Sequence, residues 1–413
     1  MKRIVLIVSI FIGMYSLAMA QETNAAVPAT NTPSAFPEEG IAFKPFPLVY
    51  YDADAGLGFG VSVSLFGYDG KSKEYLWKIY TEFTYTTKGQ MDPDIRFDIP
   101  SIWIAGQPFR LQGMAEYLYA LAENFYGYSG SMVDPLVTVG HTNSTNYFYQ
   151  QWHPYLFFTI STPLAWGKQF GHDKTLDLIV GTCIESYTFQ TNESQPVKLP
   201  SYLMNTQPLG IAGGVVWSMV VGLRFDNRDF APNPHTGTYN ELLAEFALAG
   251  GYNYSRLSFT HSAYFTPFGG YKNLILAERL MIDQLFGDVP FFKAQKIGST
   301  TVPLFDGIGG GDTMRGIAKY RFIDNLKVIF TPEIRWRFLD FGPFLWDMWH
   351  LELVVFSDIG NSWKNFEDFA FSEIYATWGL GLRILWGEDF IIAADFGFWR
   401  DQMGVYIGFD HQF

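Results

Sequence analysis

The chain has 413 residues and a formal net charge of −13, and it is 48% hydrophobic and 18% aromatic, with 40 glycines. The acidic excess argues against a nucleic-acid partner and against a basic patch that binds a membrane surface. The single cysteine, Cys183, excludes an internal disulfide. Because the sequence holds no Cys/His cluster, we expect neither a metal nor a cofactor.

The first twenty residues have the pattern of a secretory signal peptide. Lys2 and Arg3 precede an apolar run, which ends at a small-residue site at residues 18–20. The run is shorter than the roughly 20 residues that a membrane-spanning helix needs, so we expect cleavage at that site. Residues 21–42 are rich in Ala, Thr, Asn and Pro, which predicts a flexible periplasmic lead-in that is too short for a domain.

From residue 43 to residue 413, apolar and polar residues alternate with a period of two, and no helical pattern competes. We place sixteen strands near residues 43–52, 56–67, 74–86, 92–103, 109–121, 145–161, 174–190, 211–226, 237–249, 252–266, 272–286, 326–339, 349–361, 373–386, 389–399 and 402–413. Short turns alternate with longer connections at 122–144, 191–210 and 287–325, as in a barrel with one looped rim. The sequence therefore predicts an all-β fold, a 16-stranded antiparallel transmembrane β-barrel, closed because lipid cannot satisfy an open sheet edge.

Within these strands, the side-chain phase assigns one face to lipid and the other to the lumen. In the last strand, Phe409 and Phe413 fall on the lipid face, and Asp410 and Gln412 fall on the lumenal face. His261 and Glu278 fall on the lipid face of otherwise regular strands. We interpret these two residues as a sign of a bulge or a misplaced strand boundary, and the alternative is a contact with a partner such as a second copy.

The longest connection contains a glycine-rich tract, GIGGGDTMRG, at residues 307–316. Such a tract can turn sharply and approach other backbone closely. It fits a phosphate-binding loop poorly, because no buried parallel strand precedes it and no helix follows it. The strands that follow place Glu333 and Asp358 on the lumenal face, so we expect any chemistry of the barrel in this region.

Several segments, in order along the chain, resemble one family. They are the tract Asp312-Thr313-Met314-Arg315-Gly316, the run Phe356-Ser357-Asp358-Ile359-Gly360, the Asp/Arg-rich strand end and Pro-x-x-Gly turn at residues 223–239, and residues 123–127. They resemble the bacterial surface antigen, or outer-membrane assembly factor, superfamily (BamA/TamA-like barrels), in which a valine usually stands where this chain has Met314. Family members carry periplasmic POTRA modules, for which the predicted lead-in is far too short, so we expect a barrel without them.

The resemblance implies that the long loop folds into the lumen and presents an arginine to two acids. The implied loop lock is Arg315, Gly316, Glu333 and Asp358, and the implied loop hinge is Gly309, Gly310 and Gly311. An arginine in a lumen can bind carboxylates through two parallel hydrogen bonds. The alternative is that Arg315 lies in solvent at the loop tip.

The first strand suggests a weak seam. Pro45 and Pro47 are two residues apart, so their missing N–H groups would face the same neighbouring strand. If that neighbour is the strand ending at Phe413, the barrel lacks two ladder bonds there and could open laterally, as the resemblance implies. The alternative is that the strand begins after Pro47 and the prolines end the lead-in.

These features predict a protein of the bacterial outer membrane that contacts outer-membrane lipid. The resemblance implies a role in outer-membrane biogenesis, or in protein or lipid insertion or translocation, and the barrel-assembly machinery would insert the chain through Phe413. A homo-oligomer or a periplasmic partner is also expected. The alternative function is a small-conductance diffusion pore or transport channel with no assembly role. A hydrolase is disfavoured, because Ser357, His350 and His411 do not form a recognisable triad, so we expect no enzyme.

Overall fold

The computed structural model describes residues 39–70, 75–129, 147–166, 175–190, 201–267, 273–300, 304–344, 347–386, 390–400 and 402–413. The predicted signal peptide and nearly all of the predicted lead-in lie outside these residues. No helix within the described ranges is long and apolar enough to cross a membrane.

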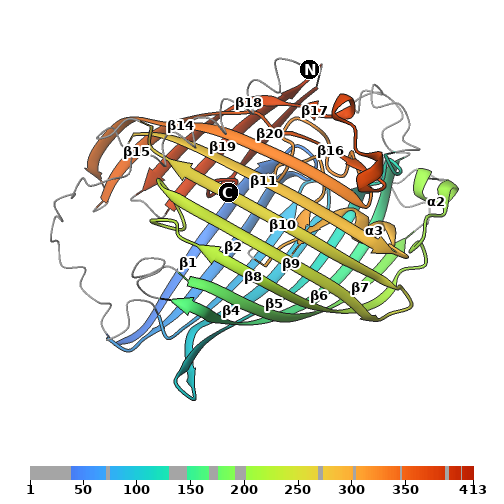
Figure 1. The fold of residues 1–413 in the computed structure, drawn as a ribbon. Coiled ribbons are helices and arrows are strands. Elements are labelled where there is room, and N and C mark those ends of the chain that lie inside the picture. Colours follow the sequence, from blue (N-terminus) through green and yellow to red (C-terminus); the bar gives the residue numbers. More distant parts are fainter. Residues whose placement is uncertain are drawn as a thin grey trace.

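The wall is one antiparallel sheet whose strands wind obliquely around a barrel (Figure 1). Its strands are β1 (Gly40–Asp52), β2 (Gly56–Tyr68), β3 (Trp77–Thr86), β4 (Gln90–Ile104), β5 (Gln107–Asn124), β6 (Phe148–Trp166), β7 (Thr175–Gln190), β8 (Gly214–Asp226), β9 (Gly237–Ala249), β10 (Tyr254–Phe265), β11 (Leu274–Gly287), β14 (Leu326–Phe344), β15 (Asp347–Phe356), β16 (Ile359–Trp363), β17 (Tyr375–Ala376), β18 (Trp378–Trp386), β19 (Phe390–Trp399) and β20 (Gln402–Phe409). Because β16 continues β15 and β18 continues β17, the wall has sixteen positions, and the predicted 16-stranded antiparallel barrel is confirmed.

The break between β15 and β16 has a backbone cause. The register is continuous across it, since Glu333 pairs with Phe356 and Phe330 pairs with Ile359. Opposite the break lies Pro332, whose carbonyl accepts from the N–H of Ser357 at 3.2 Å but which has no N–H to donate in return. Asp358 therefore sits on the lumenal side at an interruption of the ladder.

The outer face is apolar, as a lipid-facing wall requires. Along β18, Trp378, Leu380 and Leu382 are exposed, and the intervening Gly379 and Gly381 are buried. The same alternation of exposed and buried residues recurs in β9 and β19. Lipid is the solvent that such a band of exposed apolar side chains fits.

His261 and Glu278 do lie on this outer face, and the predicted bulge or boundary error is wrong. The registers of β10 with β9 and with β11 run without a shift past both residues. His261 Nδ1 lies 2.7 Å from Asn240 Oδ1, and His261 Nε2 lies 3.9 Å from Glu278 Oε1. The polar side chains on the lipid face therefore contact one another, which lowers the cost of placing them there.

The core lies inside the barrel and is built largely by one long loop, residues 288–325, which we call the plug loop. It contains α3 (Phe291–Ala294) and the hairpin of β12 (Lys296–Gly298) and β13 (Leu304–Asp306). Near α3, its buried aromatic residues Phe291 and Phe292 pack with Tyr187 and other wall residues. Further along, buried Met314 packs in a second cluster with Trp399. In the part of the chain that the structure describes, three further short helices lie in other connections: α2 (Tyr202–Thr206), η2 (Phe366–Asp368) and η3 (Phe371–Glu373).

Candidate functional site

The glycine-rich tract of the plug loop folds into a compact turn. Gly309 and Gly310 have φ values of 111° and 88°, and a Cβ at Gly309 would lie 2.1 Å from the Ala318 carbonyl oxygen. Gly311, the third predicted hinge glycine, lies in the same turn without a left-handed φ. The Thr313 hydroxyl accepts from the N–H of Gly309 at 3.0 Å. A hydrogen bond within the turn thus stabilises it, and the turn directs the following residues toward the barrel wall.

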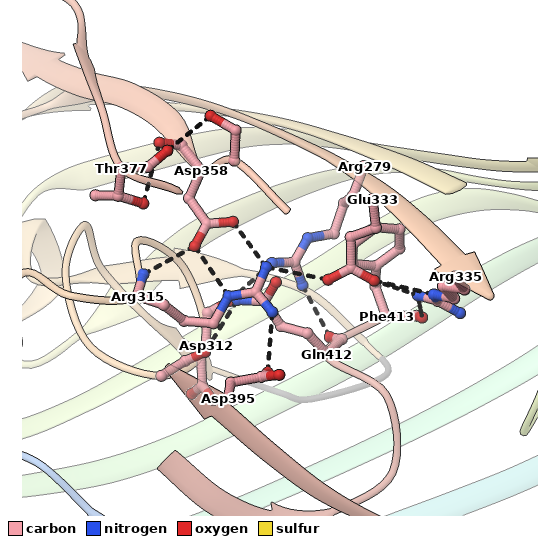
Figure 2. A network of polar contacts seen from close by, with 12 residues as sticks. Arg279, Asp312, Arg315, Glu333, Arg335, Asp358, Thr377, Asp395, Gln412 and Phe413 are labelled. Atoms are coloured by element: carbon pink, nitrogen blue, oxygen red, sulfur yellow. Dashed lines mark hydrogen bonds and ion pairs between the residues drawn. The ribbon is translucent and has the colours of Figure 1, made fainter. Parts of the chain in front are cut away.

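Arg315 points from this turn into a set of carboxylates (Figure 2). Its Nε and Nη2 donate to the two oxygens of Asp358 at 3.0 and 2.9 Å, and its backbone N–H donates to Asp358 Oδ2 at 2.9 Å. Nη2 also donates to Glu333 at 3.0 Å, and Nη1 donates to Asp395 at 2.9 Å. The guanidinium carbon lies 3.3 Å from the ring centroid of Phe356. We call Arg315 with its three acids the arginine lock.

The arginine lock is fully buried and balanced in charge. Arg315, Glu333 and Asp358 have 0% exposure. Arg335 donates from Nε to Glu333 at 2.9 Å, and Arg383 donates to both oxygens of Asp395 at 2.6 and 3.0 Å. Each lock carboxylate therefore faces at least one guanidinium, which is the condition under which buried charges are tolerated. Arg315 accordingly does not lie in solvent, contrary to the alternative prediction.

Gly316 and Gly397 allow the backbone of the arginine lock to lie close to β19. Gly316 has a φ of 95°, and a Cβ at Gly397 would lie 2.4 Å from the carbonyl carbon of Arg315. The N–H of Gly316 donates to the Tyr406 hydroxyl at 3.2 Å. Gly397, Tyr406 and Asp395 were not predicted as site residues, although Asp395 was visible in the sequence as an inward acid two residues before a glycine.

The plug loop has two further charged anchors that the sequence did not reveal. On the β7–β9 side, the buried Lys293 of α3 forms ion pairs with Glu185 and, at 2.9 Å, with Glu245. Further along the loop, Lys319 lies 3.6 Å from Glu123 of β5 and 3.0 Å from Asp306 within the plug loop. The plug loop is therefore held at opposite sections of the wall, by Lys293 on one side and by the arginine lock on the other.

One acidic side chain beside the plug loop has a shifted pKa. Burial, then the neighbouring Asp52, raises the pKa of Asp54, in the turn between β1 and β2, to about 7. Asp54 accepts from the backbone N–H of Lys319 at 3.0 Å. This acid makes the contact between the plug loop and the turn after β1 sensitive to pH around neutrality.

The barrel closes through a short seam between β1 and β20. In the described residues these strands pair at Tyr51 with Ile407 and at Asp52 with Tyr406, and at no other position. By contrast, β1 pairs with β2 along its whole length. That ladder runs unbroken through Pro45 and Pro47, which cannot donate to it, so their missing N–H groups face the β20 side. The strand begins at Gly40, so the alternative in which it begins after Pro47 is wrong.

Side chains close the seam where backbone pairing ends. The Phe46 ring lies 5.0 Å from the ring of Phe390 and 5.6 Å from the ring of Phe409, measured between centroids. A lumenal cavity of about 980 Å³ borders this stretch, lined by Phe46 and Tyr50 on one side and by Phe409 on the other. The cavity therefore reaches the weakest part of the wall.

Phe413 is not part of the seam and does not face lipid, so that prediction is corrected. β20 ends at Phe409, and Asp410 adopts a φ of 66°. The Phe413 ring lies in the lumen, 5.1 Å from the guanidinium carbon of Arg335, whose Nη2 donates to the Phe413 carbonyl at 2.9 Å. Continuing the register of β20 would place residues 411 and 413 opposite Pro47 and Pro45, which offer no donor, and this favours departure of the chain from the wall.

Comparison with known proteins identifies related folds. The family model of the Omp85 superfamily domain matches residues 106–399. Three solved barrels are similar in fold: BamA from Haemophilus ducreyi lacking POTRA domains 1–3 (TM-score 0.55, 13% identity, 90% of this chain and 70% of that chain), CdiB from Acinetobacter baumannii (0.51, 8%, 90% and 66%) and CdiB from Escherichia coli (0.55, 10%, 91% and 63%). This chain thus spans less than two thirds of each CdiB chain. No curated protein matches the sequence.

Proposed function

Because the chain belongs to the Omp85 superfamily, we propose that it serves the biogenesis of the bacterial outer membrane by passing protein or lipid through its weakly paired seam. The observation that carries the proposal is the seam itself, which has two residue pairs in the described chain, at Tyr51 and Asp52. The cavity of about 980 Å³ beside it gives a client a lumenal surface to occupy. The proposed activity is the binding and insertion of a client, without catalysis.

The chemistry of the seam suits an extended client. Before Tyr51, the β20-facing edge of β1 has no strand pairing with β20 in the described residues, and Pro45 and Pro47 lack two donors that would otherwise hold β20. An exposed sheet edge of this kind can pair with an added strand. The edge ordinarily stays covered by the ring contacts of Phe46, which are worth about 0.5–1.5 kcal/mol each and can be broken without unfolding the wall.

The arginine lock supports a second role within the proposed function, which is to hold the plug loop in place. A plug loop held by Lys293 and Arg315 at opposite sections of the wall occupies part of the lumen while the seam is closed. Without such a plug, a seam that opens would join the lumen to lipid and leave an aqueous leak. We therefore assign the arginine lock the role of keeping the plug in place during client passage.

The test is a deletion strain of the native bacterium, complemented with wild type or with variants. The proposal expects loss of specific proteins or lipids from purified outer membranes of the deletion strain, and recovery with wild type. A variant whose seam cannot open should be present at wild-type level in the outer membrane and yet fail to restore them. Outer membranes of unchanged composition in the deletion strain would contradict the proposal.

A second candidate is a small-conductance pore, favoured by the charged lining of the same cavity. Glu82, Asp92, Arg96 and Lys88 all border it. Planar-bilayer recording separates the two functions. Discrete steps in wild type that grow on deletion of residues 300–320, together with an unchanged outer membrane in the deletion strain, would favour the pore.

A further inference from the structure

The four residues that follow β20, residues 410–413, leave the wall and re-enter the lumen; we call them the return segment. The turn is made at Asp410, whose φ is 66° and whose N–H donates to the Ile391 carbonyl at 3.0 Å. From there, His411 Nε2 lies 3.2 Å from Asn233 Oδ1, in the turn between β8 and β9. The return segment therefore crosses the lumen and contacts the opposite side of the barrel, at the turn between β8 and β9.

Phe413 is held by cationic and aromatic groups. The guanidinium carbons of Arg279 and Arg335 lie 4.9 and 5.1 Å from its ring centroid, and the ring of Tyr264 lies 6.1 Å away. Two guanidinium groups over one ring, away from bulk water, make a strong contact for an aromatic residue. Both arginines are buried, with exposures of 2% and 0%, so the site is built into the wall by β11 and β14.

The same two arginines also hold the plug loop and its lock (Figure 2). Arg279 donates to the Gln412 carbonyl at 3.1 Å and to the Asp312 carbonyl at 2.7 Å. Arg335 donates to the Phe413 carbonyl and to Glu333, each at 2.9 Å. A third link is direct, because the Gln412 side-chain amide donates to the Gly311 carbonyl at 2.9 Å. Each link joins the return segment to a residue of the plug loop or of the arginine lock.

We propose that Arg279, Arg335 and Tyr264 form a binding site for the aromatic residue of the return segment, and that occupancy of this site couples the seam strand to the plug loop. The return segment is covalently continuous with β20, so displacement of β20 from β1 pulls on Phe413. Withdrawal of Phe413 removes carbonyl acceptors from both arginines and the amide donor from Gly311. The plug loop then loses the hydrogen-bond network that holds it next to the arginine lock.

Coupling of this kind is reciprocal: a seated plug loop favours a closed seam, and a closed seam favours a seated plug loop by the same factor. The inference concerns the resting protein and does not depend on which client the barrel handles. It would stand even if the proposed function failed, because each of its readouts is measured on purified protein without a client.

The experiment uses full-length protein refolded in detergent, with Cys183→Ala to remove the native thiol and with Tyr51→Cys and Ile407→Cys to lock the seam by a short thiol crosslinker. The rate of proteinase K cleavage within residues 307–322 is measured with the seam locked and unlocked. In this background, locking should slow cleavage roughly tenfold, within the usual range of coupling between two sites. Adding Phe413→Ala should raise cleavage of the unlocked protein and abolish the effect of locking. Phe371→Ala, an exposed aromatic in η3, is the matched control and should change neither value.

The proposal is overturned if seam locking slows cleavage equally in the Phe413→Ala variant and in the protein that keeps Phe413. This holds even if Phe413→Ala is cleaved faster overall, since the return segment would then hold the loop without linking it to β20. If Phe413→Ala does not give a heat-modifiable barrel, Gln412→Ala removes the direct link to Gly311 alone. It should weaken the effect of locking in the same direction, and a wild-type response in that variant would refute the coupling.

Discussion

Replacing Arg315 with alanine tests the arginine lock most sharply, because its three acids are not equally dependent on it. Glu333 keeps Arg335 and Asp395 keeps Arg383 in the variant. The Asp358 carboxylate accepts two hydrogen bonds from the Arg315 side chain and one from the Arg315 backbone N–H. The backbone N–H of residue 315 can still donate in the variant, but a fully buried carboxylate is left without its hydrogen-bonded counter-ion.

Breaking a buried pair by removing one partner costs about 3–5 kcal/mol. Because about 1.4 kcal/mol corresponds to a factor of ten, the opening equilibrium of the plug loop should rise roughly 10²- to 10³-fold. Arg315→Ala/Asp358→Asn should recover part of this loss, because the double variant leaves no unpaired charge at residue 358. Arg315→Lys should be intermediate, since an ammonium cannot reproduce the two parallel bonds to Asp358.

The assay is proteinase K cleavage within residues 307–322 of the detergent-folded protein, with heat-modifiability on gels as the check that the barrel has formed. Arg96→Ala is the matched control, because Arg96 also pairs with a lumenal acid, Asp94, but its side chain is 48% exposed. An exposed pair is worth about 1 kcal/mol or less, so the control should cleave at nearly the wild-type rate. The reasoning is refuted if Arg315→Ala cleaves within about twofold of Arg96→Ala, or if Asp358→Asn brings no recovery.

Other contacts of the loop and the seam make three more predictions. Gly397→Ala places a methyl group 2.4 Å from the carbonyl carbon of Arg315, which should cost about 1–3 kcal/mol and speed loop cleavage at least fivefold, whereas Gly408→Ala, whose Cβ meets nothing within 4 Å, should leave it unchanged. Asp54 has a folded-state pKa raised to about 7, so its contribution to stability is fully present below its ordinary pKa near 3.8 and is lost as the pH rises through 7. Asp54→Asn should therefore raise the urea midpoint at pH 8 and have little effect at pH 4, and equal effects at both would contradict the assignment. Phe46→Ala removes the ring contacts to Phe390 and Phe409 and should raise thiol labelling of the Gly408→Cys variant severalfold, while Phe396→Ala, an exposed wall aromatic, should not.

The sequence was sufficient for the wall because the signal there is local. Along β18, each apolar residue from Trp378 to Leu382 that the period assigns to lipid is exposed, and the residues between them are buried, so a period of two assigns both faces. The positions of Glu333 and Asp358 followed from the same phase. The resemblance then supplied the idea that Arg315 meets them, and the distances are 3.0 and 2.9 Å.

What the sequence could not predict depends on register or on distant partners. The path of Phe413 depends on which residues of β1 stand opposite β20, and a period of two contains no information about stagger. The anchor at Lys293 joins residues 108 positions apart in the chain, in a loop helix and in β7. The phase of the strands predicts a bulge or a boundary error at His261 and Glu278, because a charge facing lipid is costly, and the sequence does not show that Asn240 lies beside His261.

Locking the seam between β1 and β20 in the living cell tests whether the seam opens in use. Tyr51→Cys with Ile407→Cys, in the Cys183→Ala background, is expressed in the deletion strain of the native bacterium and crosslinked with a short thiol reagent. If the seam opens, the uncrosslinked pair restores the wild-type outer membrane and crosslinking abolishes the restoration, while each single cysteine remains active after the same treatment. Full activity of the quantitatively crosslinked barrel would contradict opening of the seam.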